Sequence, residues 1–207
     1  MIDATTLLTY CAIVLGFVFI PGPATLLTVA RATTSGAKVG IATGAGITVG
    51  DILHTIFAVI GLSAIIAASA TLFSIIKYLG AAYLIWLGIK AFREKAPAFA
   101  AGGPKLSAAQ AFRQAVLAEV LNPKTALFFL AFLPQFVHPE NGAAFLQLLL
   151  LGALFSLIGF GSTLVFALGA SGLGSYLRRH PSVLKWQGKV VGSIYFALGL
   201  RLAMQQR

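Results

Sequence analysis

Charged residues are scarce in this chain of 207 residues: Asp, Glu, Lys and Arg together make up 10% of it, and only five residues are acidic. Soluble domains carry about 25% charged residues. With a hydrophobic share of 58% and a mean hydropathy of +0.92, this scarcity excludes an ordinary cytosolic domain and a disordered chain. The composition indicates an integral membrane protein, with little chain left over for a soluble domain.

Cysteine occurs once, as Cys11, so the chain cannot form an intrachain disulfide. The sequence also lacks H-E-x-x-H, GxxxxGK[ST] and C-x-x-C, three patterns that mark metalloproteases, phosphate-binding loops and redox sites. The run 159–162 contains a serine but has no histidine base at a matching depth, and we interpret it as helix packing. No metal and no cofactor are expected.

The net charge of +10 would suggest a nucleic-acid partner in a soluble protein. Here the basic residues lie mostly between apolar runs, so we interpret them as markers of topology and contacts for anionic lipid headgroups. With the 91–114 loop in the cytoplasm, eleven basic residues lie inside the cell and three outside. With six helices, both chain termini are then predicted to face outward.

Six apolar stretches are long enough to cross a membrane. They comprise residues 7–30, 39–68, 71–92, 115–137, 143–170 and 190–206. The last is short and contains Arg201, so a five-helix arrangement is the alternative. The stretch 95–107 is rich in Ala, Gly and Pro, which is typical of a linker. We expect it to be cytoplasmic and to divide the chain into halves at 1–94 and 108–207.

The two halves share a sequence pattern in their third helices. The matching residues are Lys77, Gly80, Tyr83, Gly88 and Lys90 in one half and Lys189, Gly192, Tyr195, Gly199 and Arg201 in the other. Three helices per half would insert the two copies in opposite orientations, as in many secondary transporters. The predicted fold is an all-α membrane protein with six transmembrane helices in two inverted three-helix repeats.

Two prolines within three residues, Pro21 and Pro23 around Gly22, interrupt the first stretch. Each proline removes a backbone donor and clashes with the preceding turn, so a broken helix is predicted, with a simple kink as the alternative. Freed backbone groups must face protein or a watered cavity. The helix restarting after Pro23 would present its positive N-terminal end there, which suits a carboxylate.

Asn122 and Pro123 form a helix-start signature inside the fourth stretch, with Asn as the N-cap and Pro at the first helical position. Lys124 adds a positive charge and Glu119 lies about a turn and a half before it. Charged residues inside a membrane usually face the bundle interior or pair with one another. The alternative is that Glu119 and Lys124 lie near the cytoplasmic surface and extend toward water.

Asp51 is the only acidic residue in the stretch 39–68, and His54 follows it on the same helix face. A carboxyl group beside an imidazole within the membrane is suited to carrying a proton or binding an ammonium group. A structural ion pair of Asp51 with Lys124 is the alternative.

Glycines upstream of Asp51 form two ladders at helical spacing, which favour close helix approach. One comprises Gly36, Gly40 and Gly44, the other Gly46 and Gly50. We expect the first or the fourth apolar stretch to pack against them.

Three segments of the sequence together resemble the lysine exporter (LysE/RhtB) family of amino-acid efflux proteins. They are FVFIPGPATLLTVARATTSGAKVGIATGAGITVGD, IIKYLGAAYLIWLGIKAFR and LNPKTALFFLAFLPQFV. The resemblance implies a six-helix bacterial inner-membrane protein, sometimes described with five helices, that exports amino acids or their derivatives by using the proton motive force. The positions that match the family motifs are Pro21, Gly22, Pro23, Asp51, Asn122, Pro123 and Lys124. Glu119 departs from the family, which more often carries an uncharged polar residue there.

The expected function is therefore a proton-coupled secondary exporter with alternating access between the two halves. The half-helix ends and Lys124 would bind the substrate carboxylate, and Asp51 would take the ammonium group or the coupled proton. Glu119 and His54 are further candidates for proton coupling. The expected partners are a small amino-acid substrate, protons and membrane lipids, and a homodimer stays open. The alternatives are an ion channel or ion exporter of the same fold and an intramembrane enzyme.

Overall fold

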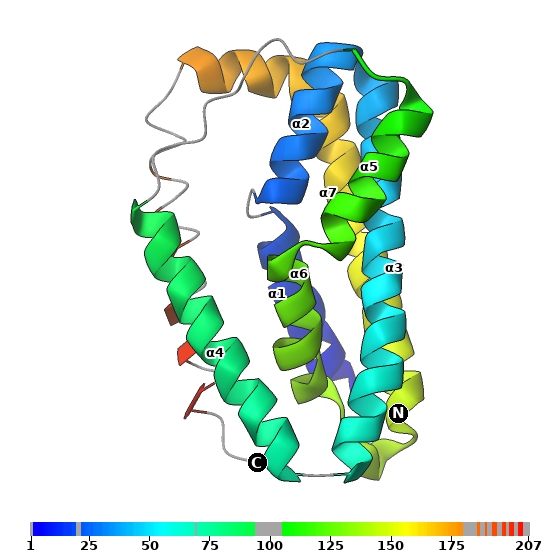
Figure 1. Ribbon diagram of the computed structural model, residues 1–207, viewed down its shortest axis with the longest axis vertical. Coiled ribbons are helices and arrows are strands. Elements are labelled where there is room, and N and C mark those ends of the chain that lie inside the picture. The colour runs from blue at the N-terminus through cyan, green and yellow to red at the C-terminus, as the bar shows by residue number, and fades with distance from the viewer. Residues whose placement is uncertain are drawn as a thin grey trace.

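A computed structural model describes residues 2–19, 22–68, 70–93 and 105–179, together with scattered residues between 186 and 204. Within this part of the chain all regular secondary structure is helical (Figure 1). The elements are α1 (Ala4–Phe19), α2 (Pro23–Ser35), α3 (Ala37–Ala68), α4 (Ala70–Arg93), α5 (Ala108–Val120), α6 (Pro123–Leu127), the π-helix η1 (Phe128–Phe132), the 3-10 turns η2 (Leu133–Phe136) and η3 (Pro139–Asn141), and α7 (Ala144–Arg179). The predicted all-α class is confirmed.

Two single helices are long and apolar enough to cross a membrane, namely α3 over Ala37–Gly61 and α7 over Ala144–Ala170. Each of two bent helix pairs passes the same test when it is taken as one unit. The described residues therefore contain two to four candidate spans. The six-helix, two-repeat arrangement stays a prediction, and the stretch 190–206 lies largely outside the described residues.

Both predicted helix breaks are confirmed. The axis turns by 51° between α1 and α2, and by 44° between α5 and the segment Pro123–Phe136. At the first break Gly22 has an extended backbone and Pro23 begins α2, while Pro21 lies outside the described residues. At the second break Asn122 caps α6 and Pro123 is its first residue. The simple kink is therefore not the conformation of the first stretch.

The start of α5 differs from the fourth apolar stretch, which begins at residue 115. The helix begins at Ala108 because Ser107 and Gln110 form a capping box, in which each side chain bonds the other residue's backbone N–H. The polar residues that follow Ser107 are thus helical, although they are too polar to mark a membrane span. The predicted linker 95–107 lies outside the described residues apart from 105–107.

The glycines of α3 let it pack closely between α5 and α7. A Cβ added at Gly46 would lie 2.4 Å from the carbonyl oxygen of Phe112, and one at Gly50 would lie 2.5 Å from Cβ of Glu119. This ladder packs against the helix that leads into the fourth stretch, as expected.

The first glycine ladder has two partners, so the expectation for it is met at Gly40, beside α2, and is wrong at Gly44. A Cβ at Gly44 would lie 2.5 Å from the hydroxyl oxygen of Thr163, so this face packs against α7 in the fifth stretch. Gly40 lies between Ala32 of α2 and Ala167 of α7. No atom lies within 4 Å of a Cβ added at Gly36. This residue is the C-cap of α2, and its φ of +92° is a conformation that suits glycine.

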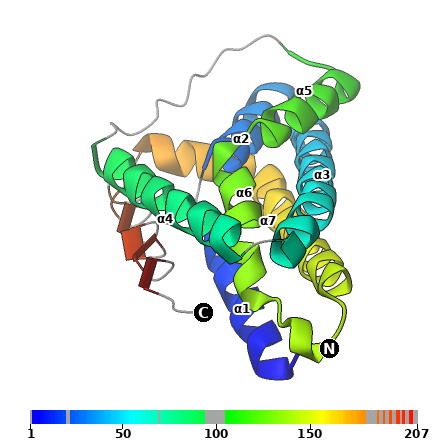
Figure 2. The ribbon, with the colours of Figure 1, turned by 60° about the horizontal axis from the view of Figure 1, so that its bottom comes forward.

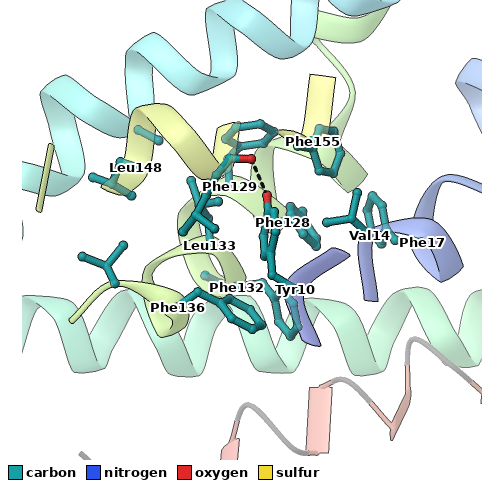
Figure 3. Packing of buried hydrophobic residues seen from close by; sticks show 14 of the residues in the cluster. Tyr10, Val14, Phe17, Phe128, Phe129, Phe132, Leu133, Phe136, Leu148 and Phe155 are labelled. Atoms are coloured by element: carbon teal, nitrogen blue, oxygen red, sulfur yellow. Dashed lines mark hydrogen bonds between the residues drawn. The ribbon is translucent and has the colours of Figure 1, made fainter. Parts of the chain in front are cut away.

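A buried aromatic core joins α1, η1 and α7 (Figure 3). The ring of Phe128 lies 4.6 Å from that of Phe17 and 4.8 Å from that of Phe155, measured between centroids. The hydroxyl group of Tyr10 donates a hydrogen bond of 2.8 Å to the carbonyl oxygen of Leu151. The helix α4 lies along the side of this bundle and contacts η1 (Figure 2). The core therefore fills the half of the molecule in which α1 begins.

Candidate functional site

A cavity of about 40 Å³ lies where the two helix breaks meet the middle of α3 and α7. At roughly 10–15 Å³ for each enclosed water, this volume holds about three waters. Its charged wall consists of Asp51, Glu119 and Lys124, and the rings of Phe17 and Phe155 lie at the side of the aromatic core.

Most of the predicted site residues meet in this cavity. Those that line it are Gly22, Pro23, Asp51, Glu119, Asn122 and Lys124. Pro123 is the first residue of α6 and does not line the cavity. His54 does not line it either, but its ring contacts the backbone carbonyl of Glu119. These residues come from four helices, so the site depends on tertiary packing.

Lys124 joins the two helix breaks. Its ammonium nitrogen donates a hydrogen bond of 3.2 Å to the carbonyl oxygen of Phe17 and lies 4.2 Å from the centroid of that residue's ring. A Cβ added at Gly22 would lie 3.2 Å from the same nitrogen, so the glycine leaves room for it. Because Lys124 is only 9% exposed, the alternative that it extends to the membrane surface is wrong for this structure.

The carboxyl groups of Asp51 and Glu119 lie together in the wall of this cavity, and each residue is 2% exposed. Glu119 accepts further hydrogen bonds from the side-chain amide of Asn122, at 3.1 and 3.2 Å, and from the hydroxyl group of Thr125. Two buried carboxyl groups beside one ammonium group, that of Lys124, balance its charge when one of them is protonated. The surface location of Glu119 is excluded in this structure.

His54 holds the end of α5 in place. A ring nitrogen of His54 is 2.9 Å from the main-chain carbonyl oxygen of Glu119, and the ring stacks on Phe129. The same carbonyl accepts a hydrogen bond of 2.9 Å from the backbone N–H of Asn122, so the ring of His54 adds a second partner at the end of α5. The structure thus brings His54 to the backbone of Glu119, and its predicted part in proton coupling stays a prediction.

The two half-helix starts differ in how they are capped. Asn122 accepts a hydrogen bond of 3.1 Å from the backbone N–H of Lys124, so the start of α6 is satisfied within the protein. Gly22 offers no side-chain cap to α2, and Ala24 and Thr25 in its first turn line the cavity. Helix N-termini with uncapped N–H groups attract anions. The positive end of α2 therefore lies in the same cavity wall as the ammonium group of Lys124.

Sequence reasoning missed several residues of the site. The carbonyl of Phe17 showed no signal, because its partner Lys124 is distant in sequence. Thr125 was not selected, although its partner Glu119 is six positions away. The run 159–162, interpreted as packing alone, also contributes to the site: Gly159 and Ser162 line the cavity, and a Cβ at Gly159 would lie 3.3 Å from a carboxyl oxygen of Asp51. A small residue and a hydroxyl one turn apart in the middle of a span were the available signal.

Comparison with known proteins identifies the chain's relatives. Residues 15–206 match the sequence model of the LysE type translocator family. An uncharacterized membrane protein of Vibrio cholerae is 33% identical over 206 residues, covering 97% of this chain and 98% of the relative. The uncharacterized membrane protein YrhP of Bacillus subtilis is 37% identical over 163 residues, covering 74% and 77%. An uncharacterized membrane protein of Pseudomonas aeruginosa is 32% identical over 201 residues, covering 92% of each.

No solved structure matches this chain. The family match extends over nearly the whole sequence and includes both helix breaks and every charged residue of the cavity, which confirms the resemblance seen in the motifs. The protein is a membrane transporter that belongs to the LysE type translocator family.

Proposed function

We propose that this protein is a proton-coupled secondary exporter of amino acids or amino-acid derivatives in the bacterial inner membrane. One observation carries the proposal: a buried ammonium group and a buried pair of carboxyl groups line the same small cavity between two broken helices. This arrangement complements a molecule that carries both a carboxylate and an ammonium group.

The carboxylate of the substrate would bind at the first helix break. Lys124 supplies a positive charge beside Gly22, and α2 adds the positive end of its backbone dipole. A charge inside the membrane is costly unless it is paired, so an anion between these two groups is favoured. The substrate carboxylate would then replace the carbonyl oxygen of Phe17 as a hydrogen-bond acceptor for part of the ammonium group of Lys124.

The ammonium group of the substrate would bind at Asp51. The carboxyl group of Asp51 lies beside Gly159, where the absence of a side chain leaves space next to it. Ile47, Phe17 and Phe155 provide an apolar wall for the carbon atoms between the two charged ends. The site thus has two polar poles and an apolar side, as small-molecule sites commonly have.

The order of the helices supports the proposed inverted repeat of six spans. A bent pair precedes a long helix in both halves: α1 and α2 before α3, then α5 and α6 before α7. The glycines of the repeated pattern lie where the third and sixth stretches approach. A Cβ at Gly88 would lie 2.8 Å from the carbonyl oxygen of Gly192, and one at Gly199 would lie 2.9 Å from that of Ala81.

A cavity for about three waters is small for an amino acid, so transport would require a second conformation with a larger site. Alternating access of two halves around a central site provides such a change. The cavity continues past Asp51 to Ile47 and Thr163, whereas the aromatic core fills the side beyond Phe155. This structure would therefore be closed toward the end at which α1 begins.

Transport by the purified protein in liposomes tests the proposal. Labelled glycine, alanine, leucine and lysine would be followed with and without an imposed pH gradient, with protein-free liposomes as the control. We expect saturable exchange of at least one of them, and accumulation that the gradient drives. Ion conductance without saturable amino-acid flux would contradict the proposal and favour an ion channel or ion exporter of the same fold.

A further inference from the structure

The acid pair in the cavity is unusual among the acidic residues of this chain. Of the five acids, Asp3 and Glu140 are exposed and Glu94 lies outside the described residues, whereas Asp51 and Glu119 are buried together. They come from different helices, α3 and α5, and Gly50 allows these helices to approach closely enough for both acids to line one cavity. The pair is therefore built by packing and is not a local feature of one helix.

The hydrogen bonds indicate which member of the pair holds the proton. Both oxygens of Glu119 accept from the amide of Asn122, and one also accepts from Thr125. Such a set of donors stabilises a carboxylate. Because these donors stabilise Glu119 as the carboxylate, the proton of the pair is assigned to Asp51.

The charges around the pair limit it to one proton. Lys124 of α6 faces it with a positive charge, which opposes a second proton. His54 of α3 is bonded through its ring to the backbone of Glu119, and Tyr10 of α1 donates its hydroxyl to Leu151. α7 brings no acidic or basic side chain between residues 144 and 177. With one proton, the two acids and Lys124 have a net charge of zero.

This inference rests on the proposed export function. We propose that Asp51 and Glu119 hold one proton between them, and that the ammonium group of the substrate displaces it, so that one proton is exchanged for each amino acid exported. Glu119 is the positioning residue of this exchange. Without a second carboxylate beside it, Asp51 next to Lys124 would form a simple ion pair and would have no proton to exchange.

Each half of the exchange conserves atoms and charge. On the cytoplasmic side the O–H bond of Asp51 breaks, the proton passes to water, and the substrate ammonium donates its hydrogens to the two carboxylates. On the outer side water delivers a proton to Asp51 and the ammonium group leaves. Because a zwitterion has no net charge, each cycle moves one positive charge inward, and an inside-negative membrane potential therefore drives export.

Binding at different pH values tests the inference on the purified parent protein, Glu119→Gln and the matched control Glu140→Gln, which changes an exposed acid. The probe is whichever labelled amino acid of the liposome panel the parent exchanges fastest. We expect the apparent Kd of the parent and the control to weaken as the pH falls, approaching about tenfold for each pH unit, the limiting slope of linkage to one proton. In Glu119→Gln this slope should fall below about twofold.

A second measurement does not depend on the variant. In weakly buffered solution the parent should release about one proton for each amino acid bound. Binding without proton release, or a parental pH slope in Glu119→Gln, would overturn the inference and leave the proposed function standing. If the parent binds none of the four amino acids, the proposed function fails and the inference falls with it. If Glu119→Gln does not fold, the proton release of the parent decides alone.

Discussion

The ammonium nitrogen of Lys124 lies 3.2 Å from the main-chain carbonyl oxygen of Phe17, so a side chain from the second helix break binds the end of the helix at the first. Phe17 belongs to the last turn of α1. His54 binds the carbonyl of Glu119 at the end of α5 in the same manner. A side chain of another element therefore contacts a main-chain carbonyl at each break.

Replacing Lys124 tests its contact with the substrate. Lys124→Gln removes the charge, and we expect the apparent affinity for the amino acid to fall by about 10- to 100-fold, equivalent to about 1.5–3 kcal/mol for a hydrogen bond to a charged group. Lys124→Arg should recover little, because a planar guanidinium does not fit beside Gly22. Membrane insertion should stay normal. The measurement is substrate exchange in liposomes, with the exposed Lys38→Gln as control. Parental exchange by Lys124→Gln would reduce Lys124 to a structural contact.

Asp51→Asn separates substrate binding from proton coupling. The amide keeps the size and the hydrogen-bonding capacity of the side chain but cannot titrate. We expect the variant to fold and to lose net accumulation against a gradient, with any remaining flux limited to exchange. Labelled amino acid would be followed in liposomes with an imposed pH gradient, beside Asp3→Asn as an exposed control. Accumulation equal to that of the parent would rule out Asp51 as the proton carrier, whereas loss of exchange as well would assign it to substrate binding.

A methyl group at Gly50 should separate α3 from α5. Its Cβ would lie 2.5 Å from Cβ of Glu119 and 2.9 Å from Cγ, so Gly50→Ala must displace the acid pair. Overpacking of this kind costs about 1–3 kcal/mol, and we expect a Tm lower by several degrees together with weaker transport. Gly61→Ala on the same helix is the matched control, because nothing lies within 4 Å of its Cβ. That control should equal or exceed the parental Tm, since alanine favours a helix.

The charge distribution predicts which end of the molecule faces the cytoplasm. The guanidinium group of Arg31 donates a hydrogen bond of 2.7 Å to Gln114, and the backbone of Leu106 donates one of 3.2 Å to Ser35. The end of α2 and the start of α5 therefore lie at one end of the bundle, opposite the start of α1 (Figure 1). Reporter fusions within the 91–114 loop should indicate a cytoplasmic location. A periplasmic signal there would reverse the proposed orientation.

Much of the fold could be predicted from local features of the chain. Apolar stretches of membrane length indicated the helices, because burying uncharged segments in lipid does not depend on their partners. Pro23 and the pair Asn122 and Pro123 predicted both helix breaks for the same reason: a missing N–H or a side-chain cap acts on the backbone within one turn. The basic residues similarly predicted an orientation without reference to helix packing.

The chemistry of the cavity was decided by tertiary structure. Asp51 could be singled out as a buried acid, but its place beside Glu119 in one cavity depends on how far each helix is rotated and how deep it lies. Those two quantities are set by contacts between helices, such as Gly50 against Glu119 and Gly44 against Thr163. Lys124 and Phe17 are 107 positions apart in the chain, and no sequence period relates them. Helical periodicity indicates which residues share a face, whereas only packing determines which face it meets.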